Sequence, residues 1–154
     1  MGYPNGMTSD TDRGDAIINP DDVANSYVDS DVPGELRRLT DALDGDQLAV
    51  TLNRVPAHCD FEHGTGHHHK QTEEVYLVTR GTLTMRFFGT IETVRAPAAV
   101  RVAPGTTRSH RNEGDEDVEM WAILDSATDP TRRKSTSSGR SRPRHARREI
   151  ERPG

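Results

Sequence analysis

The sequence has little from which to build disulfides, membrane spans or signal segments. Cys59 is the only cysteine among 154 residues, so neither an intramolecular disulfide nor a multi-cysteine metal site can form. Such usage is typical of a reducing, cytoplasmic setting. No run approaches the roughly 20 apolar residues that span a bilayer, and residues 1–10 lack the basic and apolar stretches of a secretory signal. We expect a cytoplasmic protein with no membrane partner.

Apolar residues are also scarce, and they are unevenly placed. They make up 31% of the chain, against 29% charged residues, so a core can form only where they gather. They gather between residues 48 and 124. Both ends are polar and rich in turn-forming residues, which bury too little surface to offset the entropy of ordering. We predict a disordered tail over residues 1–25, one domain over residues 26–127 and a disordered tail over residues 128–154.

Charge is unevenly distributed as well. Residues 130–154 carry nine Lys or Arg against two acids, so this tail is +7 and the rest of the chain −12, which together give the net charge of −5. A basic tail can fold back on an acidic domain or contact an anionic partner. This tail has no aromatic side chains on which bases can stack. We therefore predict no sequence-specific nucleic-acid binding.

The spacing of apolar residues changes along the chain. In residues 33–43, Leu36, Leu39 and Leu43 recur at helical spacing, which predicts one short N-terminal amphipathic helix. From residue 48 onward, short runs rich in β-branched and aromatic residues are separated by turn residues, which predicts an antiparallel sandwich or barrel. The fold class is thus all-β. The predicted strands are residues 48–55, 74–79, 82–88, 91–95, 99–102, 108–112 and 118–124.

Candidate metal ligands are concentrated in residues 66–74, which read GHHHKQTEE. In an extended segment His67 and His69 point to one face and His68 to the other. Glu74 begins the next strand after a four-residue gap, so a turn can bring its carboxylate to the same side. Two imidazoles and one carboxylate suit iron, manganese, nickel or zinc and leave coordination positions open. Open positions permit Lewis-acid or oxygen chemistry.

These residues resemble the pattern of a known family. His67-x-His69, four residues, Glu74, six residues and Gly81, with a later block at residues 104–112, are similar to the two motifs of the cupin superfamily. The resemblance implies a small antiparallel jelly-roll barrel, in which two sheets close around a core. It further implies a divalent metal ion, a small-molecule ligand and a homodimer.

The resemblance covers residues 48–124 and departs from the family pattern at two positions. The glycine usually found six residues before the first histidine falls at Phe61. The position of the family's third histidine, counted from Gly105, holds Arg108. Either Arg108 replaces that ligand and His110 lies deeper on the same face, or a bulge shifts His110 into the ligand position.

Arg108 cannot ligate a metal, because its guanidinium is permanently cationic and only donates hydrogen bonds. It can instead bind a carboxylate or phosphate beside the metal. Tyr76 shares the strand parity of Glu74 and should line the same cavity, whereas Val75 and Leu77 should pack on the other face. The family's interval to its glycine selects Glu74 over the neighbouring acid. The predicted site therefore comprises the metal residues His67, His69, Glu74 and His110 and the ligand-binding residues Arg108 and Tyr76.

Two functions are consistent with these residues. One is a metal-dependent cupin that binds a small anionic molecule and acts on it as an oxygenase or isomerase. The alternative is a non-catalytic binding or sensory cupin whose second motif, with Arg108 in place of histidine, has lost the metal. The reaction itself has no signature in the sequence.

Overall fold

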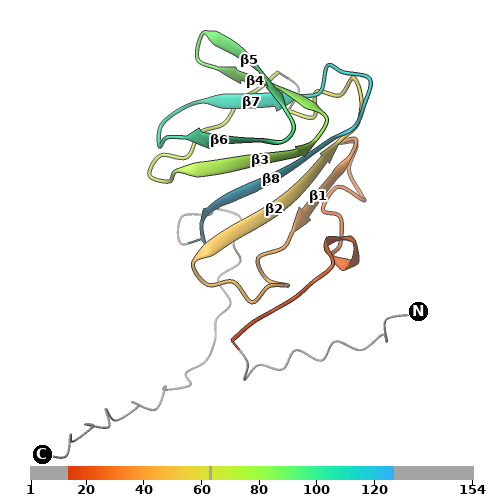
Figure 1. Cartoon of the computed structure of the whole chain (residues 1–154), viewed down its shortest axis with the longest axis vertical. Helices are drawn as coiled ribbons and strands as arrows, with labels where there is room; N and C mark the ends of the chain where they lie inside the picture. The colour runs from red at the N-terminus through yellow and green to blue at the C-terminus, as the bar shows by residue number, and fades with distance from the viewer. Residues whose placement is uncertain (1–13, 63, 127–154) are drawn as a thin grey trace, which may run out of the picture.

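A computed structural model describes residues 14–62 and 64–126. In this part of the chain, strands form two antiparallel sheets, with the orders β1-β2-β8-β3-β6 and β5-β4-β7 (Figure 1). The elements are η1 (Pro20–Asp22), β1 (Glu35–Arg38), β2 (Leu48–Val55), β3 (Glu74–Arg80), β4 (Thr82–Phe87), β5 (Thr90–Arg95), β6 (Ala98–Val102), β7 (Arg108–Arg111) and β8 (Val118–Asp125). The all-β class and the seven predicted strands are confirmed, with ends that differ by at most one residue. No helix among these residues is long and apolar enough to cross a membrane.

The helix predicted over residues 33–43 is wrong. Its first half is strand β1, which pairs with β2 from Glu35 opposite Arg54 to Arg38 opposite Thr51. Gly34, with φ +94°, lies outside the right-handed helical region immediately before the strand. Pairing with a strand distant in sequence supplies backbone hydrogen bonds that the local leucine spacing cannot reveal.

Residues 20–25, which the sequence assigns to the N-terminal tail, lie against β1. The Arg37 guanidinium donates a hydrogen bond to the carbonyl oxygen of Asp21 at 2.9 Å. The Asp21 carboxylate in turn lies 2.6 Å from the Arg54 guanidinium of β2. The remaining parts of the two predicted tails, residues 1–13 and 127–154, lie outside the described residues.

The core lies between the two sheets, where alternate side chains of each strand meet. Tyr76 and Val78 of β3, Met85 of β4 and Met120 of β8 are each at most 2% exposed. Burying an apolar side chain of this size stabilises the fold by about 1.5–3 kcal/mol. Glu74 has the same parity in β3 and is 4% exposed, so a carboxylate faces the interior beside this core.

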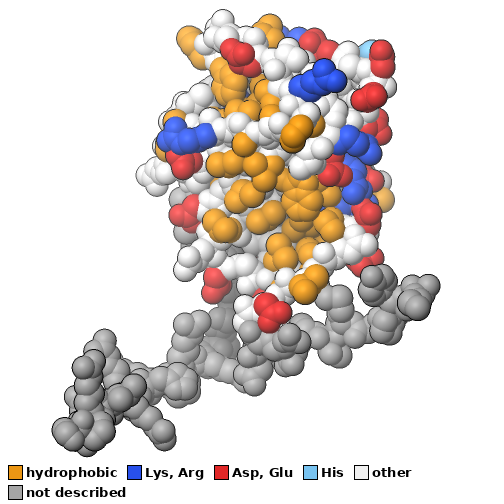
Figure 2. All heavy atoms as spheres, in the orientation of Figure 1, with side chains coloured by type: hydrophobic (Ala, Val, Ile, Leu, Met, Phe, Trp, Pro, Cys, Tyr) orange, Lys and Arg blue, Asp and Glu red, His pale blue; other side chains and the backbone are white. Residues whose placement is uncertain are grey.

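The outer face of the five-stranded sheet is also rich in apolar side chains (Figure 2). Val75 and Leu77 are half-buried on it, as predicted, beside Trp121 and Ile123 of β8. Leu48 is 56% exposed at its edge. A groove of about 640 Å³ runs along this face between the ends of β2, β3 and β8. The molecule thus has one closed apolar core and one open apolar face.

Candidate metal centre

The two predicted histidine ligands lie in the loop between β2 and β3, on a segment that pairs with β7. The His67 N–H donates to the Arg108 carbonyl at 2.9 Å, and the Arg108 N–H donates to the His67 carbonyl at 3.0 Å. This pairing keeps residues 67–69 extended, so the imidazoles of His67 and His69 lie together with ring centroids 5.6 Å apart. His68 is exposed. The predicted alternation of the three histidines is therefore confirmed.

Glu74 completes a group of three ligand side chains. One ligand atom from each of His67, His69 and Glu74 lies within 4.8 Å of the others. Ligand atoms that lie about 2.0–2.2 Å from one shared ion are at most about 4.4 Å apart, so small side-chain movements would bring the three atoms to coordination distance. Two imidazole nitrogens and a carboxylate oxygen are donors that borderline divalent metals accept. The residues therefore fit a divalent metal ion.

Glu73 and Glu74 lie on opposite faces of the sheet. The Glu73 carboxylate is about half exposed and pairs with the Arg101 guanidinium on the outer side of the sheet. Glu74, one residue further along the pleat, faces the interior and the histidines, with the His69 Nε2 3.5 Å from its Oε2. The strand parity of β3 decides between the two acids.

Arg108 and Tyr76 hold the carboxylate of Glu74. The Tyr76 hydroxyl donates to Glu74 Oε2 at 2.6 Å, and the Arg108 Nη2 donates to the same oxygen. The Arg108 Nε donates to the Tyr76 hydroxyl oxygen at 3.0 Å, and its Nη1 lies 3.4 Å from the His67 carbonyl oxygen. Arg108 is only 1% exposed, so its donors are directed at protein acceptors.

Burial shapes the protonation of both partners. It lowers the pKa of Arg108 to about 10, which still leaves the guanidinium charged at neutral pH. It raises the pKa of the Tyr76 phenol, which keeps the hydroxyl protonated and able to donate. Glu74 is thus the anionic member of a buried ion pair, with a neutral phenol as its second donor.

The register of β7 decides between the two alternatives for the third-histidine position. Arg108 lies opposite Phe87 and His110 opposite Met85, in a continuous pairing of β4 with β7. The bulge that would bring His110 into the ligand position is therefore absent from β7, and that alternative is wrong. Arg108 itself occupies the position beside His67. His110 is not part of the cluster, which has three ligand residues rather than the predicted four.

His110 is instead a buried imidazole that packs deeper in the barrel. It is 5% exposed, and its ring centroid lies 4.7 Å from that of Phe61 and 5.5 Å from that of Tyr76. Burial lowers the pKa of His110 to about 4, so the ring is neutral at pH 7. Its Nδ1 makes no hydrogen bond within the described residues.

A second carboxylate, Glu62, approaches the centre from the loop that precedes the histidines. Its Oε1 lies 2.9 Å from the His67 Nδ1, and its Oε2 accepts the backbone N–H of His110 at 2.6 Å. Sequence reasoning missed Glu62, because a single acid in a loop without periodicity carries no signal.

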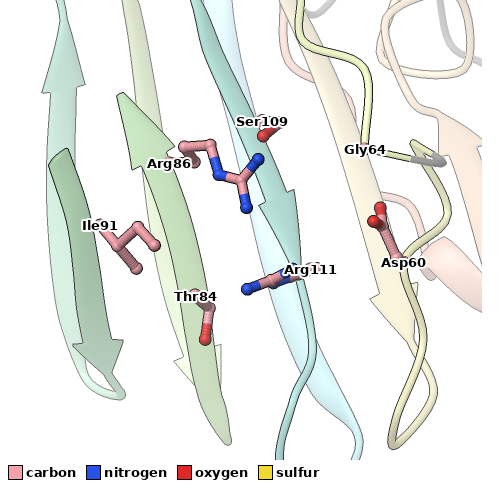
Figure 3. Close-up of a pocket in the computed structure, with 7 residues that line it drawn as sticks. All are labelled: Asp60, Gly64, Thr84, Arg86, Ile91, Ser109 and Arg111. Atoms are coloured by element: carbon pink, nitrogen blue, oxygen red, sulfur yellow. The ribbon is translucent and has the colours of Figure 1, made fainter. Parts of the chain in front are cut away.

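A separate small cleft lies on the outer face of the three-stranded sheet (Figure 3). Arg86 of β4 and Arg111 of β7 line it, with Thr84, Ser109 and Asp60 nearby. Its volume of about 10 Å³ holds a single water at most. Residues 109 and 111 alternate with Arg108 and His110, so this cleft is on the far side of β7 from the metal centre.

The two antiparallel sheets that close around a core give the chain the fold of solved cupin proteins. Similar solved structures include a protein described as a predicted oxalate decarboxylase from Thermotoga maritima (TM-score 0.56, 16% identity, 71% of this chain and 97% of that chain). Another is a cupin 2 conserved barrel domain protein from Salinispora arenicola (TM-score 0.53, 16% identity, 73% of this chain and 88% of that chain). A third is a sugar phosphate isomerase of the cupin superfamily from Silicibacter pomeroyi (TM-score 0.54, 19% identity, 60% of this chain and 59% of that chain).

The chain spans 59% of the length of that isomerase. No family model and no curated protein matches the sequence. At these identities the likeness concerns the fold.

Proposed function

We propose that this chain binds a divalent metal through His67, His69 and Glu74, and a small anionic molecule beside it. The proposal is carried by the convergence of three ligand atoms within 4.8 Å of one another. Iron, manganese, nickel and zinc all accept this donor set. Sugar phosphates and oxalate, which appear in the descriptions of two similar structures, are small anions, in keeping with the proposal.

The charges around the centre support an anionic ligand. Arg108 and Glu74 cancel as an ion pair, and the imidazoles of His67 and His69 are neutral when they ligate a metal. A divalent ion then adds two positive charges, of which the Glu62 carboxylate offsets one. Because an unbalanced charge in a buried site is costly, an anion that binds beside the metal is favoured.

The metal and the residues around it have separate roles in the proposed function. A bound metal supplies Lewis-acid or oxygen chemistry at its open positions, the chemistry of isomerases and oxygenases. Tyr76 and Arg108 both donate to Oε2 of Glu74, the oxygen that lies 3.5 Å from the His69 Nε2, and so orient the carboxylate toward the histidines. Because the donors of Arg108 already reach protein acceptors, its contribution is to balance the charge of Glu74 and to orient that carboxylate.

The test is the metal content of purified protein after chelation, reloading with each candidate metal and dialysis. We expect about one ion per chain in the wild type, as a three-ligand mononuclear site requires, and loss of the ion in the His67→Ala/His69→Ala double variant. His68→Ala is the matched control, because it alters the same histidine run but faces away, and it should retain the metal. Equal metal content in the double variant and the wild type would contradict the proposal.

One observation favours a second candidate function, a non-catalytic binding or sensory role. The Arg108 guanidinium already neutralises Glu74 without a metal. A protein that uses Arg108 in place of a metal should show a rise in melting temperature with oxalate or inorganic phosphate that persists in excess chelator, since a ligand that binds the native state raises its stability. A rise that requires added metal would favour the first function instead.

We also propose that two copies of the chain associate through the open face of the five-stranded sheet. A twofold interface uses the same surface on both copies, so one apolar face suffices, and Leu77, Trp121 and Ile123 provide it. Sedimentation at increasing concentration should approach twice the chain mass of 17.1 kDa. Leu77→Lys should weaken the association, whereas Ile91→Lys, on the outer face of the other sheet, should not. A mass of one chain at every concentration would contradict this proposal.

A further inference from the structure

Glu62 is held in place on both sides of its carboxylate. Its backbone carbonyl accepts the N–H of Thr65 at 2.9 Å and the Thr65 hydroxyl at 2.6 Å, which closes a turn and directs the side chain inward. The side chain is 14% exposed. The backbone N–H of His110 donates to Oε2 at 2.6 Å. Because that N–H belongs to strand β7, its direction is fixed, and one carboxylate oxygen is committed to it.

The other carboxylate oxygen faces His67. Oε1 lies 2.9 Å from the His67 Nδ1, and an ionised carboxylate can only accept hydrogen bonds. The Nδ1 must therefore carry the proton. A neutral imidazole has one N–H, so its Nε2 then presents a lone pair, which is the form that ligates a metal.

The backbone of His67 does not by itself fix the ring. Its main-chain bonds to Arg108 hold the extended segment, but the side chain is 41% exposed, so water can reach the imidazole and stabilise either tautomer. Glu62 provides the restraint that the backbone lacks. In contrast, Glu74 is oriented directly by Arg108 and Tyr76.

We infer that Glu62 is a positioning residue that keeps the proton of His67 on Nδ1 and so leaves Nε2 as the ligand atom. This inference rests on the proposed metal site. It assigns to Glu62 a role in metal affinity without contact with the ion, a role that the histidine and glutamate pattern alone does not include.

The substitution Glu62→Gln makes a sharp prediction because it preserves the shape of the side chain. The fixed N–H of His110 requires the amide oxygen of the glutamine, so its NH₂ group faces the His67 Nδ1. That nitrogen must then accept a hydrogen bond, and the proton moves to Nε2. The variant is expected to invert the tautomer of His67 and, since outer-shell partners of a ligating histidine are worth about 10–100-fold in metal affinity, to weaken Co²⁺ or Ni²⁺ binding by that factor.

The tautomer is measured on metal-free protein labelled with ¹⁵N-histidine, from correlations between ring protons and ring nitrogens. The His67 signals are identified by their loss in His67→Ala. The wild type should show a protonated Nδ1, and Glu62→Gln a protonated Nε2. Glu73→Gln is the matched control, since it changes the same functional group on the outer face, and it should match the wild type in both tautomer and affinity.

Two results would overturn the inference: a protonated Nε2 in the metal-free wild type, or an inverted tautomer in Glu62→Gln with metal affinity within twofold of the wild type. The first needs no variant, so it decides the question even if Glu62→Gln fails to fold. Absence of metal from the wild type would instead contradict the proposed function, while the tautomer measurement would still test the restraint on His67.

Discussion

The two carboxylates beside the centre are held by opposite means. Glu74 is paired with a buried cation, Arg108, and a phenol, whereas Glu62 faces the His67 ring and a backbone N–H. At Glu74, the Arg108 guanidinium balances the carboxylate charge in the barrel interior. At Glu62, the contacts depend instead on the direction of individual N–H groups. Glu74 and its cation should therefore govern the stability of the centre, whereas Glu62 should govern which nitrogen of His67 is available as a ligand.

Removal of the cation should have the largest effect. Arg108→Met leaves the Glu74 carboxylate buried without its cation, and breaking a buried ion pair on one side costs about 3–5 kcal/mol. Denaturant unfolding of the metal-free protein measures this loss. The double variant Glu74→Gln/Arg108→Met removes both charges and should recover most of the stability. If Arg108→Met were as stable as the wild type, the ion pair would not contribute to the stability of the barrel.

The pH dependence of stability should reveal the burial of the neutral His110 imidazole. His110 has a pKa lowered to about 4 from the ordinary 6.5, so the unfolded chain binds a proton before the native state does. Stability is then lost as pH falls from about 6.5 to about 4, by about 3 kcal/mol for a shift of this size.

The matched variant His110→Phe keeps an aromatic ring against Phe61 and Tyr76 but cannot be protonated. In metal-free protein it should flatten this part of the stability profile, measured by urea unfolding at a series of pH values. Parallel profiles for the two proteins would mean that His110 is not the group responsible.

Truncation of Glu62 should have a smaller effect. Glu62→Ala leaves the buried N–H of His110 without its acceptor, and an unsatisfied buried donor costs about 2 kcal/mol. Glu62→Gln retains an acceptor and should lose much less. Urea unfolding of both variants tests this difference. Equal losses would indicate that the charge of Glu62, rather than its hydrogen bond to β7, stabilises the fold.

The smallest effect is expected at the phenol that assists Arg108. Tyr76→Phe removes a donor to Glu74 while the ion pair persists, which should cost about 1 kcal/mol. Thermal unfolding of the variant and the wild type, both metal-free, measures it. A loss as large as that of Arg108→Met would reverse the proposed ranking of the two donors.

The parts of the molecule that could be predicted from sequence are those encoded locally. Strand periodicity located β2 to β8, and the alternation of His67 and His69 with the parity of Glu74 brought the cluster together. Strand β1 was missed because its pairing with β2 competes with a leucine spacing typical of helices. Glu62 was missed because its partner His110 lies on a strand far along the chain, and only the folded barrel brings them together.

The mutual backbone hydrogen bonds between His67 and Arg108 have a mechanical consequence for the centre. They are possible because Gly66 runs so close to β7 that a Cβ there would lie 3.0 Å from the Arg108 carbonyl oxygen. The segment that carries both imidazoles is therefore attached to the strand that carries the guanidinium. Separating this segment from β7 would break main-chain hydrogen bonds. The two imidazoles and the Arg108 guanidinium should therefore move together as one rigid unit when a ligand binds.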